Sequence, residues 1–316
     1  MSQQSQSVRG KVVEQVIDPL WNRYQYRLRK TWNAFRVVFA NDMAKIGGVV
    51  LLAFVVMAVF APTIAPHNPH ERVTTEDGGW QKNLGPSLSH PLGTTGEAYP
   101  LFSRLVFGTR VAFLVGLLTA VIVAGVGTVV GMVAGYRGGY VEEVLMRVVD
   151  TAYGLPFLPF VIVLIMILGR GYLSIVLAIS IILWRGTARV VRSEVVSIKE
   201  QPMIDAARAS GASDRRIIFR HVLPKVLPIT MLYSVFAIGW AIIAEAGLSF
   251  IGFGDSSMIS WGLILNNAHT GNALLQGMWI WIVAPGVCII LFVLSTYFIS
   301  QGIEEVVNPQ LRSAER

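Results

Sequence analysis

Long apolar runs that carry almost no charge constrain this sequence more than any other feature. A helix rises about 1.5 Å per residue, so about 20 apolar residues cross a hydrocarbon core roughly 30 Å thick. Six segments meet this requirement: 46–66, 111–135, 149–169, 172–190, 227–251 and 278–300. The apolar residues are gathered in these runs, whereas a soluble domain spreads them at the helical or strand period. The sequence therefore predicts an integral membrane protein.

The predicted spans are helices. A spanning segment must satisfy its backbone polar groups internally, which leaves only helices and closed barrels. The runs lack the alternation of apolar and polar residues that marks a barrel strand. The chain is 53% hydrophobic and only 14% charged, whereas soluble domains average about 25% charged residues. We expect an all-α protein with six transmembrane helices, of which the third and fourth form a tight hairpin at Arg170-Gly171.

The distribution of basic residues predicts the orientation in the membrane. The net charge is +7, and 21 of the 26 Lys and Arg residues lie in 1–45, 136–147, 185–225 and the C-terminal tail. Cytoplasmic loops carry such an excess, so both termini and the 191–225 loop are predicted to be cytoplasmic. The same asymmetry explains most of the net charge without nucleic acid. Because the first apolar run begins only at Ile46, we expect an uncleaved span and no cleavable signal peptide.

These expectations divide the chain into five parts: a cytoplasmic segment 1–45, a first span 46–66, an extracytoplasmic loop 67–110, a membrane core 111–302 and a cytoplasmic tail 303–316. Aromatic residues recur at helical spacing between Trp21 and Phe39, with basic residues between them. This segment is predicted to be an amphipathic helix, either on the membrane surface or against a partner subunit. Gly127, Gly131 and Gly135 share one face of the second span and predict close helix packing.

The loop between the fourth and fifth spans is predicted to form two short helices. Pro202 suits the first turn of a helix, and Asp205, Ala206 and Ala207 continue it. Gly211 can adopt the left-handed conformation that ends this helix. Ser213 can cap a second helix running to His221, and Pro224 is expected to break the chain before the fifth span. A helix–turn–helix element of this kind can sit in a groove of another protein.

This loop resembles the EAA loop of ABC-importer permeases. Asp205-Ala-Ala is followed four residues later by Gly211, and His221-Val-Leu-Pro224 closes the motif. Further stretches resemble permeases of the dipeptide, oligopeptide and nickel (DppC/OppC) type: Ala134-Gly135-Tyr136-x-Gly138-Gly139, Met146-Arg147-x-x-Asp150, Trp184-x-x-x-Ala188-Arg189, Glu245-Ala-x-Leu248-Ser249-Phe250, Trp261-Gly262 and Asn308-Pro309-x-Leu311. The chain departs from the family pattern before the second span, where Thr95 replaces an acidic residue and Ala98-Tyr99-Pro100 replaces Gly-Arg-Asp.

The resemblance implies a type I ABC importer permease fold and a docking role for the loop. The implied docking residues are Asp205, Ala206, Ala207, Gly211, Arg215, Arg216, His221, Leu223 and Pro224. Arg215, Arg216 and Arg220 could instead contact anionic lipid headgroups, and His221 is expected to be a helix-end residue and not a proton switch. The implied partners are a second, DppB/OppB-like permease, two ATPase subunits or domains, an extracytoplasmic substrate-binding protein and the surrounding lipid.

The chain itself carries no G-x-x-x-x-G-K-[ST] phosphate loop. It is therefore predicted to be a transporter subunit and not an enzyme, with ATP and Mg²⁺ bound by partner subunits. No catalytic constellation and no cofactor site is evident. His67-x-x-His70 lacks a third ligand at useful spacing, so we predict no metal site. Peptides are the favoured cargo; nickel or another small solute is the alternative, with a proton-coupled secondary transporter or a membrane scaffold as less favoured functions.

Two acidic residues lie within predicted spans, where a charge is costly and often marks a pathway. Asp150 is expected to pair with Arg147 one helical turn away, near the cytoplasmic end. Glu245 has no basic neighbour in the sequence, and it could serve gating or subunit contact, or form a buried structural hydrogen bond. Trp261, Trp279 and Trp281 are predicted to anchor the outer membrane interface.

Overall fold

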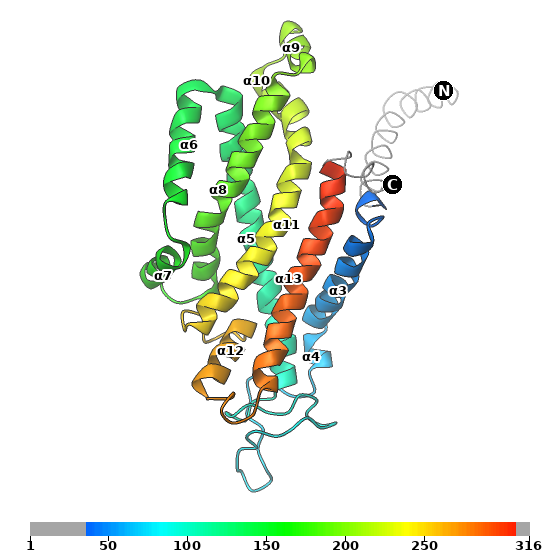
Figure 1. The fold of residues 1–316 in the computed structure, drawn as a ribbon, viewed down its shortest axis with the longest axis vertical. Coiled ribbons are helices and arrows are strands. Elements are labelled where there is room, and N and C mark those ends of the chain that lie inside the picture. The colour runs from blue at the N-terminus through cyan, green and yellow to red at the C-terminus, as the bar shows by residue number, and fades with distance from the viewer. Residues whose placement is uncertain (1–35, 308–316) are drawn as a thin grey trace, which may run out of the picture.

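The computed structural model describes residues 36–307, and this part of the chain is a bundle of helices (Figure 1). Its only extended pairings are two isolated bridges, Thr74–Trp80 and Thr94–Pro100. The elements are α3 (Asp42–Val59), α4 (Ala61–Ile64), α5 (Leu101–Arg137), α6 (Gly139–Tyr153), α7 (Phe157–Leu168), α8 (Tyr172–Lys199), α9 (Pro202–Ala209), α10 (Asp214–Ile217), the π-helix η2 (Ile218–Val222), α11 (Leu223–Phe250), α12 (Trp261–Thr270) and α13 (Ile280–Val307).

The bundle has two distinct ends (Figure 1). One end, which we call the coupling end, carries α9 and α10; the opposite end carries the loop 65–100 and the short helix α12. Among the described residues, five helical segments are long and apolar enough to cross a membrane, and a sixth crossing is available if α6 and α7 count as one. The predicted all-helical membrane architecture is confirmed.

The helices extend beyond the apolar runs that predict them. Helix α5 begins at Leu101, ten residues before the predicted span, and its 37 residues measure about 55 Å at the rise of a regular helix. Helix α8 continues to Lys199, so the first part of the predicted 191–225 loop is helical. Apolar composition marks only the part of a helix that lies in lipid, whereas backbone hydrogen bonds continue into the aqueous layers.

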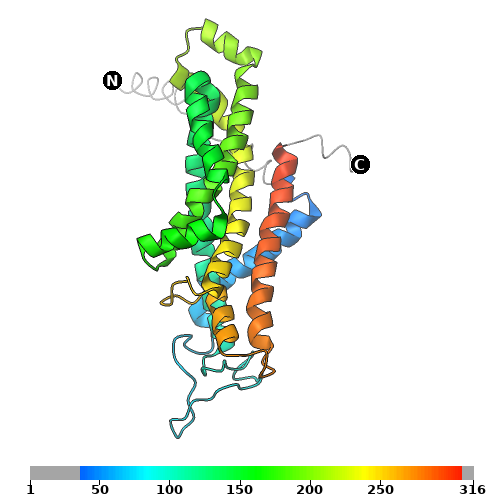
Figure 2. The same ribbon diagram turned by 60° about the vertical axis from the view of Figure 1, so that its left-hand side comes forward.

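The third predicted span is not one straight helix, and the expectation of a continuous 149–169 helix is wrong. Helices α6 and α7 meet at an angle of 96°, and Figure 2 shows α7 turned away from the bundle axis. The break contains Gly154 and Pro156. Proline donates no backbone hydrogen bond and disfavours the helical conformation of the residue before it, so the helix ends there. Three residues, Gly169 to Gly171, connect α7 to α8.

The glycine face predicted in the second span packs against α8, which confirms that expectation. A Cβ atom placed on Gly127 would lie 2.6 Å from the Thr187 side chain, and one on Gly135 would lie 2.8 Å from the backbone oxygen of Arg192. The α5 and α8 backbones therefore approach more closely than any side chain would permit. In lipid, where apolar groups gain little by leaving the solvent, such close packing holds helices together.

An aromatic cluster fills the bundle near its opposite end. Phe54 of α3, Trp261 of α12 and Phe292 of α13 are buried, and their ring centroids lie 5.3–5.9 Å apart. The indole of Trp261 donates a hydrogen bond to the carbonyl of Leu105. Trp281 is also buried, at 2% exposure, so that of the three predicted anchors only Trp279 is exposed. The prediction that Trp261 and Trp281 are interfacial anchors is wrong, because their rings pack inside the chain.

The predicted amphipathic helix over Trp21–Phe39 lies mostly outside the described residues, as does the Asn308–Leu311 motif. The start of α3 and the end of α13 meet at the coupling end, where the Asn41 amide donates a hydrogen bond to the Glu305 carboxylate. Helices α3 and α13 also meet at Gly47, where an added Cβ would lie 2.6 Å from the Ser295 backbone oxygen. The first and last described helices therefore form one antiparallel pair.

Candidate functional site

The loop that resembles the EAA motif forms a compact element at the coupling end, and we call residues 200–222 the coupling element. Helix α9 starts with Pro202 in its first turn, after an extended Gln201. It contains Asp205, Ala206 and Ala207, as the sequence predicts. Asp205 lies three residues before Arg208, and their charged atoms are 3.7 Å apart in an exposed pair. Such an exposed pair adds little stability, so the carboxylate remains available to a partner.

Gly211 forms the turn of the coupling element. Its φ is +79°, the left-handed region that disfavours side chains, and an added Cβ would meet nothing within 4 Å. The turn is closed by two backbone hydrogen bonds, from Gly211 N to the Arg208 carbonyl and from Ala212 N to the Ala207 carbonyl. These bonds satisfy carbonyl groups at the end of α9. The predicted helix end at Gly211 is confirmed.

The second helix of the coupling element does not end at Pro224. Ser213 has the extended conformation of a capping residue but makes no side-chain capping bond. From Asp214 the chain runs through α10, η2 and α11 as one helical segment to Phe250. Pro224 lies in the first turn of α11, directly after the widened π-turn. The expectation of a break at Pro224 is wrong. Proline has no backbone N–H, and it is tolerated at a position where the helix needs no N–H to donate a backbone hydrogen bond.

Apolar residues hold the underside of the coupling element against the bundle. Ile204 of α9 and Ile217 of α10 are fully buried. They belong to one core cluster with the ends of three long helices, which comprises Tyr136, Val191, Val195, Ile198, Ile204, Ile217, Val222 and Val226. Burial of a large aliphatic side chain stabilises by about 1.5–3 kcal/mol. The coupling element is therefore packed on α5, α8 and α11 and does not behave as a free loop.

The outer face of the coupling element carries most of the predicted docking residues. Asp205, Ala206, Gly211, Arg215, Arg216 and Pro224 are exposed, whereas Ala207, His221 and Leu223 are half-buried. Two residues outside the predicted docking set are also exposed on this element, Phe219 at 66% and Met203 at 40%. The sequence itself indicates that these two side chains are exposed, because both positions lie off the apolar stripe defined by Ile204, Ile217 and Val222. Two exposed apolar side chains among charges suit a protein interface.

Asp150 pairs with a different arginine from the one predicted. Its carboxylate lies 2.6 Å from the guanidinium of Arg189 on α8, whereas Arg147 approaches Glu143 at 3.8 Å. About two turns earlier on α6, Glu142 accepts a hydrogen bond from Arg192, also on α8. The predicted Arg147–Asp150 pair is therefore wrong, because these carboxylates of α6 pair with arginines of the neighbouring helix α8. These pairs tie α6 to α8 at the coupling end.

Glu245 lies inside the bundle, near the far end of α11. It is 6% exposed, and its carboxylate accepts a 2.6 Å hydrogen bond from the Ser249 hydroxyl one turn later. The Ser260 hydroxyl also lies within hydrogen-bonding reach. Gly262 packs against the same turn, where an added Cβ would lie 2.6 Å from the Ala246 backbone. The carboxylate thus links the end of α11 to the start of α12.

A Glu245→Gln variant separates the two roles considered for this residue. Glutamine keeps a side-chain oxygen that can accept the Ser249 hydrogen bond, so we expect the yield of folded protein to be unchanged and uptake to change less than about tenfold. Glu245→Leu leaves the Ser249 hydroxyl unpaired and should lower the free energy of unfolding by about 1–3 kcal/mol. Normal folding of Glu245→Gln with uptake abolished would show that the charge itself serves gating.

The histidines of the loop 65–100 do not form the arrangement considered in the sequence. His67 stacks on His90 with ring centroids 4.4 Å apart, while His70 is exposed. Burial lowers the pKa of His90, and the neighbouring His67 lowers it further. Residues 36–307 contain no group of three or more His, Cys, Asp or Glu side chains that could hold a metal ion.

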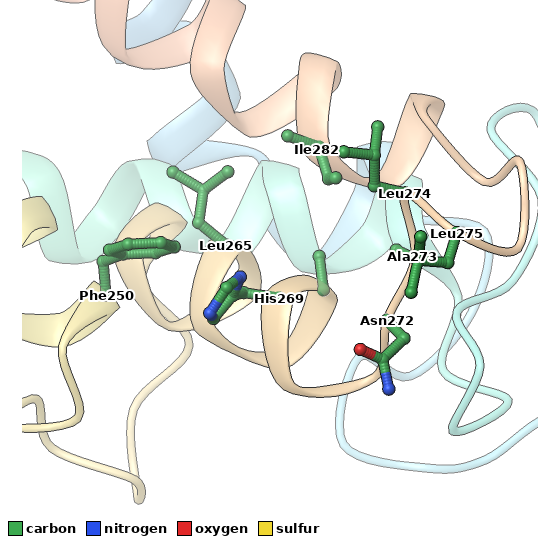
Figure 3. Close-up of a pocket in the computed structure, with 9 residues that line it drawn as sticks. Phe250, Leu265, His269, Asn272, Ala273, Leu274, Leu275 and Ile282 are labelled. Carbon is green, nitrogen blue, oxygen red and sulfur yellow. The ribbon is translucent and has the colours of Figure 1, made fainter.

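The opposite end of the bundle holds an apolar pocket of about 310 Å³ between α12 and the start of α13 (Figure 3). It is lined by Phe250, Leu265, Ala268, His269, Asn272, Ala273, Leu274, Leu275 and Ile282. The His269 ring lies beside Phe250, with centroids 5.5 Å apart. Leu274 and Leu275 are strongly exposed at its rim. Apolar side chains form most of the lining, and His269 and Asn272 are its polar members.

Comparisons with known proteins agree with this geometry. Residues 127–313 match the family model described as binding-protein-dependent transport system inner membrane component, and residues 30–86 match the N-terminal TM domain of oligopeptide transport permease C. The dipeptide transport system permease protein DppC of Bacillus subtilis is 33% identical, over 90% of this chain and 87% of that protein. The oligopeptide permease OppC of Haemophilus influenzae is 32% identical, over 95% of each chain.

A glutathione transport system permease, GsiD of Pectobacterium atrosepticum, is 30% identical over 90% of this chain and 93% of that protein. Among solved structures, an inward-facing form of the MetNI methionine ABC transporter matches with a TM-score of 0.50 at 17% identity, over 65% of this chain and 98% of that chain. At this low identity, the likeness supports only the fold, which is that of an ABC importer permease. The matched family model spans more than half of the sequence, and the chain therefore belongs to the inner-membrane permeases of binding-protein-dependent transport systems.

Proposed function

We propose that this chain is one of two permease subunits of an ABC importer for di- and oligopeptides. The observation that carries the proposal is the coupling element: a rigidly packed helix–turn–helix with an exposed face of charged and apolar side chains at one end of the bundle. The names of the relatives, which transport dipeptides, oligopeptides and glutathione, support a peptide substrate. ATP and Mg²⁺ are bound by partner ATPase subunits.

The coupling end faces the cytoplasm in this proposal. The excess of basic residues in 1–45, 136–147 and 185–225 supports this orientation. The Asn41–Glu305 hydrogen bond joins the start of α3 to the end of α13 at the same end as the coupling element. In this proposal both termini lie in the cytoplasm and the loop 65–100 lies outside, where an extracytoplasmic substrate-binding protein delivers the peptide.

The proposed mechanism is transmission of movement through the docking residues. Asp205, Ala206, Gly211, Arg215 and Arg216 contact the ATPase subunits, whose closure on ATP shifts the coupling element. His221, Leu223 and Pro224 lie at the junction with α11 and carry the shift into that helix. Because α10, η2 and α11 form one helical segment, the shift reaches the membrane core as a rigid-body movement between inward-open and outward-open states.

Reconstitution tests the proposal. Proteoliposomes that contain this chain, the second permease and the ATPase subunits, with ATP on the ATPase side, should accumulate a labelled dipeptide only when the substrate-binding protein is present. The chain reconstituted alone should show no uptake with or without a proton gradient. Gradient-driven uptake by the chain alone would refute the proposal in favour of a secondary transporter. Accumulation of Ni²⁺ but not of peptides would show that the proposed peptide substrate is wrong. The proposed role as an ABC importer permease would then still stand.

A further inference from the structure

One buried tyrosine connects the coupling element to a helix that is not its neighbour in the chain. Tyr136 lies in the last turn of α5 and is only 5% exposed. Its hydroxyl donates a 2.7 Å hydrogen bond to the carboxylate of Asp214, the first residue of α10. A hydrogen bond to a carboxylate is shorter and stronger than one between neutral groups. This is a directional contact, in contrast to the surrounding aliphatic packing.

The same tyrosine also reaches the other side of the Gly211 turn. The guanidinium of Arg208, at the end of α9, lies 6.0 Å from the centroid of the Tyr136 ring, within the range of a cation–π interaction. The phenol therefore contacts both short helices, one on each side of Gly211. A Cβ atom added to Gly211 would meet nothing within 4 Å. Contacts such as these help to fix the angle between α9 and α10, together with the packing of Ala207 and Ala212 on the core beneath.

The connectivity of the chain gives this contact its importance. The coupling element is joined covalently to α8 before it and to α11 after it. Helix α5 is held to α8 by the glycine face, but its only hydrogen bond to α10 runs from Tyr136, among the described residues. We propose that Tyr136 is a positioning residue that locks α9 and α10 to α5, so that displacement of the coupling element moves α5, α8 and α11 together. This inference rests on the proposed function.

The test measures the amount of peptide transported per ATP separately from the assembly of the ATPase subunits on the permease. In the full complex in proteoliposomes, Tyr136→Phe should leave ATPase co-purification intact and ATP hydrolysis nearly unchanged. The amount of peptide transported per ATP should fall about three- to tenfold, the size expected for one lost hydrogen bond. Asp214→Ala should give the same loss, and the double variant should add nothing to it, because both remove one interaction. Asp214→Asn keeps the acceptor oxygen and should restore the coupling ratio.

Thr128→Val is the matched control. The hydroxyl groups of Thr128 on α5 and Thr230 on α11 are buried and 3.0 Å apart, so this variant removes a hydroxyl contact of α5 at a distance from the coupling element. It should keep the wild-type amount of peptide per ATP. An unchanged ratio in Tyr136→Phe, or an equal fall in Thr128→Val, overturns the role of Tyr136. A wild-type complex that assembles no ATPase on this chain refutes the proposed function instead.

Discussion

A Gly131→Leu variant is expected to lose the folded bundle. A Cβ at this position would lie 2.5 Å from the backbone oxygen of Ala188 and 2.7 Å from the Val191 side chain. Overpacking typically costs about 1–3 kcal/mol, and a whole leucine side chain against a backbone that cannot move aside should exceed this. Protein stability is only about 5–15 kcal/mol in total. The variant should therefore be degraded or aggregate, measured as membrane yield and as the monodisperse fraction in detergent.

Gly125 of the same helix provides the control. It is exposed, and a Cβ added there would meet nothing within 4 Å. Gly125→Leu adds the same side chain to the same helix and also removes the low helix propensity of glycine. We expect its yield to match that of the wild type. Equal yields of Gly131→Leu and Gly125→Leu would contradict the close packing of α5 on α8.

A Gly211→Leu variant should fold but lose its ATPase partner. Gly211 has φ +79° and open space around its Cα atom, so the leucine side chain would project from the exposed turn of the coupling element. The left-handed conformation costs an L-residue roughly 1–2 kcal/mol, which the packed underside at Ile204 and Ile217 can offset. The added side chain would hold the ATPase away from Asp205 and Ala206. We expect uptake to fall at least about tenfold, since 1.4 kcal/mol of lost contact suffices for that.

Gly78 separates loss of docking from backbone strain. Its φ is also +79°, and it too has nothing within 4 Å of an added Cβ, but it lies in the loop 65–100 at the opposite end. Gly78→Leu therefore introduces the same strain without altering the coupling element. Affinity purification of the tagged permease should recover the ATPase subunits with Gly78→Leu but not with Gly211→Leu. Recovery with both variants, together with normal uptake, would show that the docking hypothesis is wrong.

The prolines show that the local sequence does not determine whether a helix breaks. Pro156 lies at a break between two helices that meet at 96°. Pro224, Pro228 and Pro285 lie within helices that continue past them. All four residues lack the same donor, yet only one ends its span. The difference depends on whether neighbouring helices and a π-turn can accommodate the missing bond, which the local sequence does not specify.

The sequence by itself determined the helical spans other than the third, the glycine face of α5 and the turn at Gly211. Each depends on local properties: the length of an apolar run, the absence of a Cβ, or the backbone freedom of one residue. Only the tertiary structure decided which side chains meet. Asp150 pairs with Arg189, 39 positions away, instead of Arg147 on its own helix, and Tyr136 reaches Asp214 across 78 positions. The physical reason is that partition into lipid follows from local composition, whereas pairing requires that two distant segments be packed side by side.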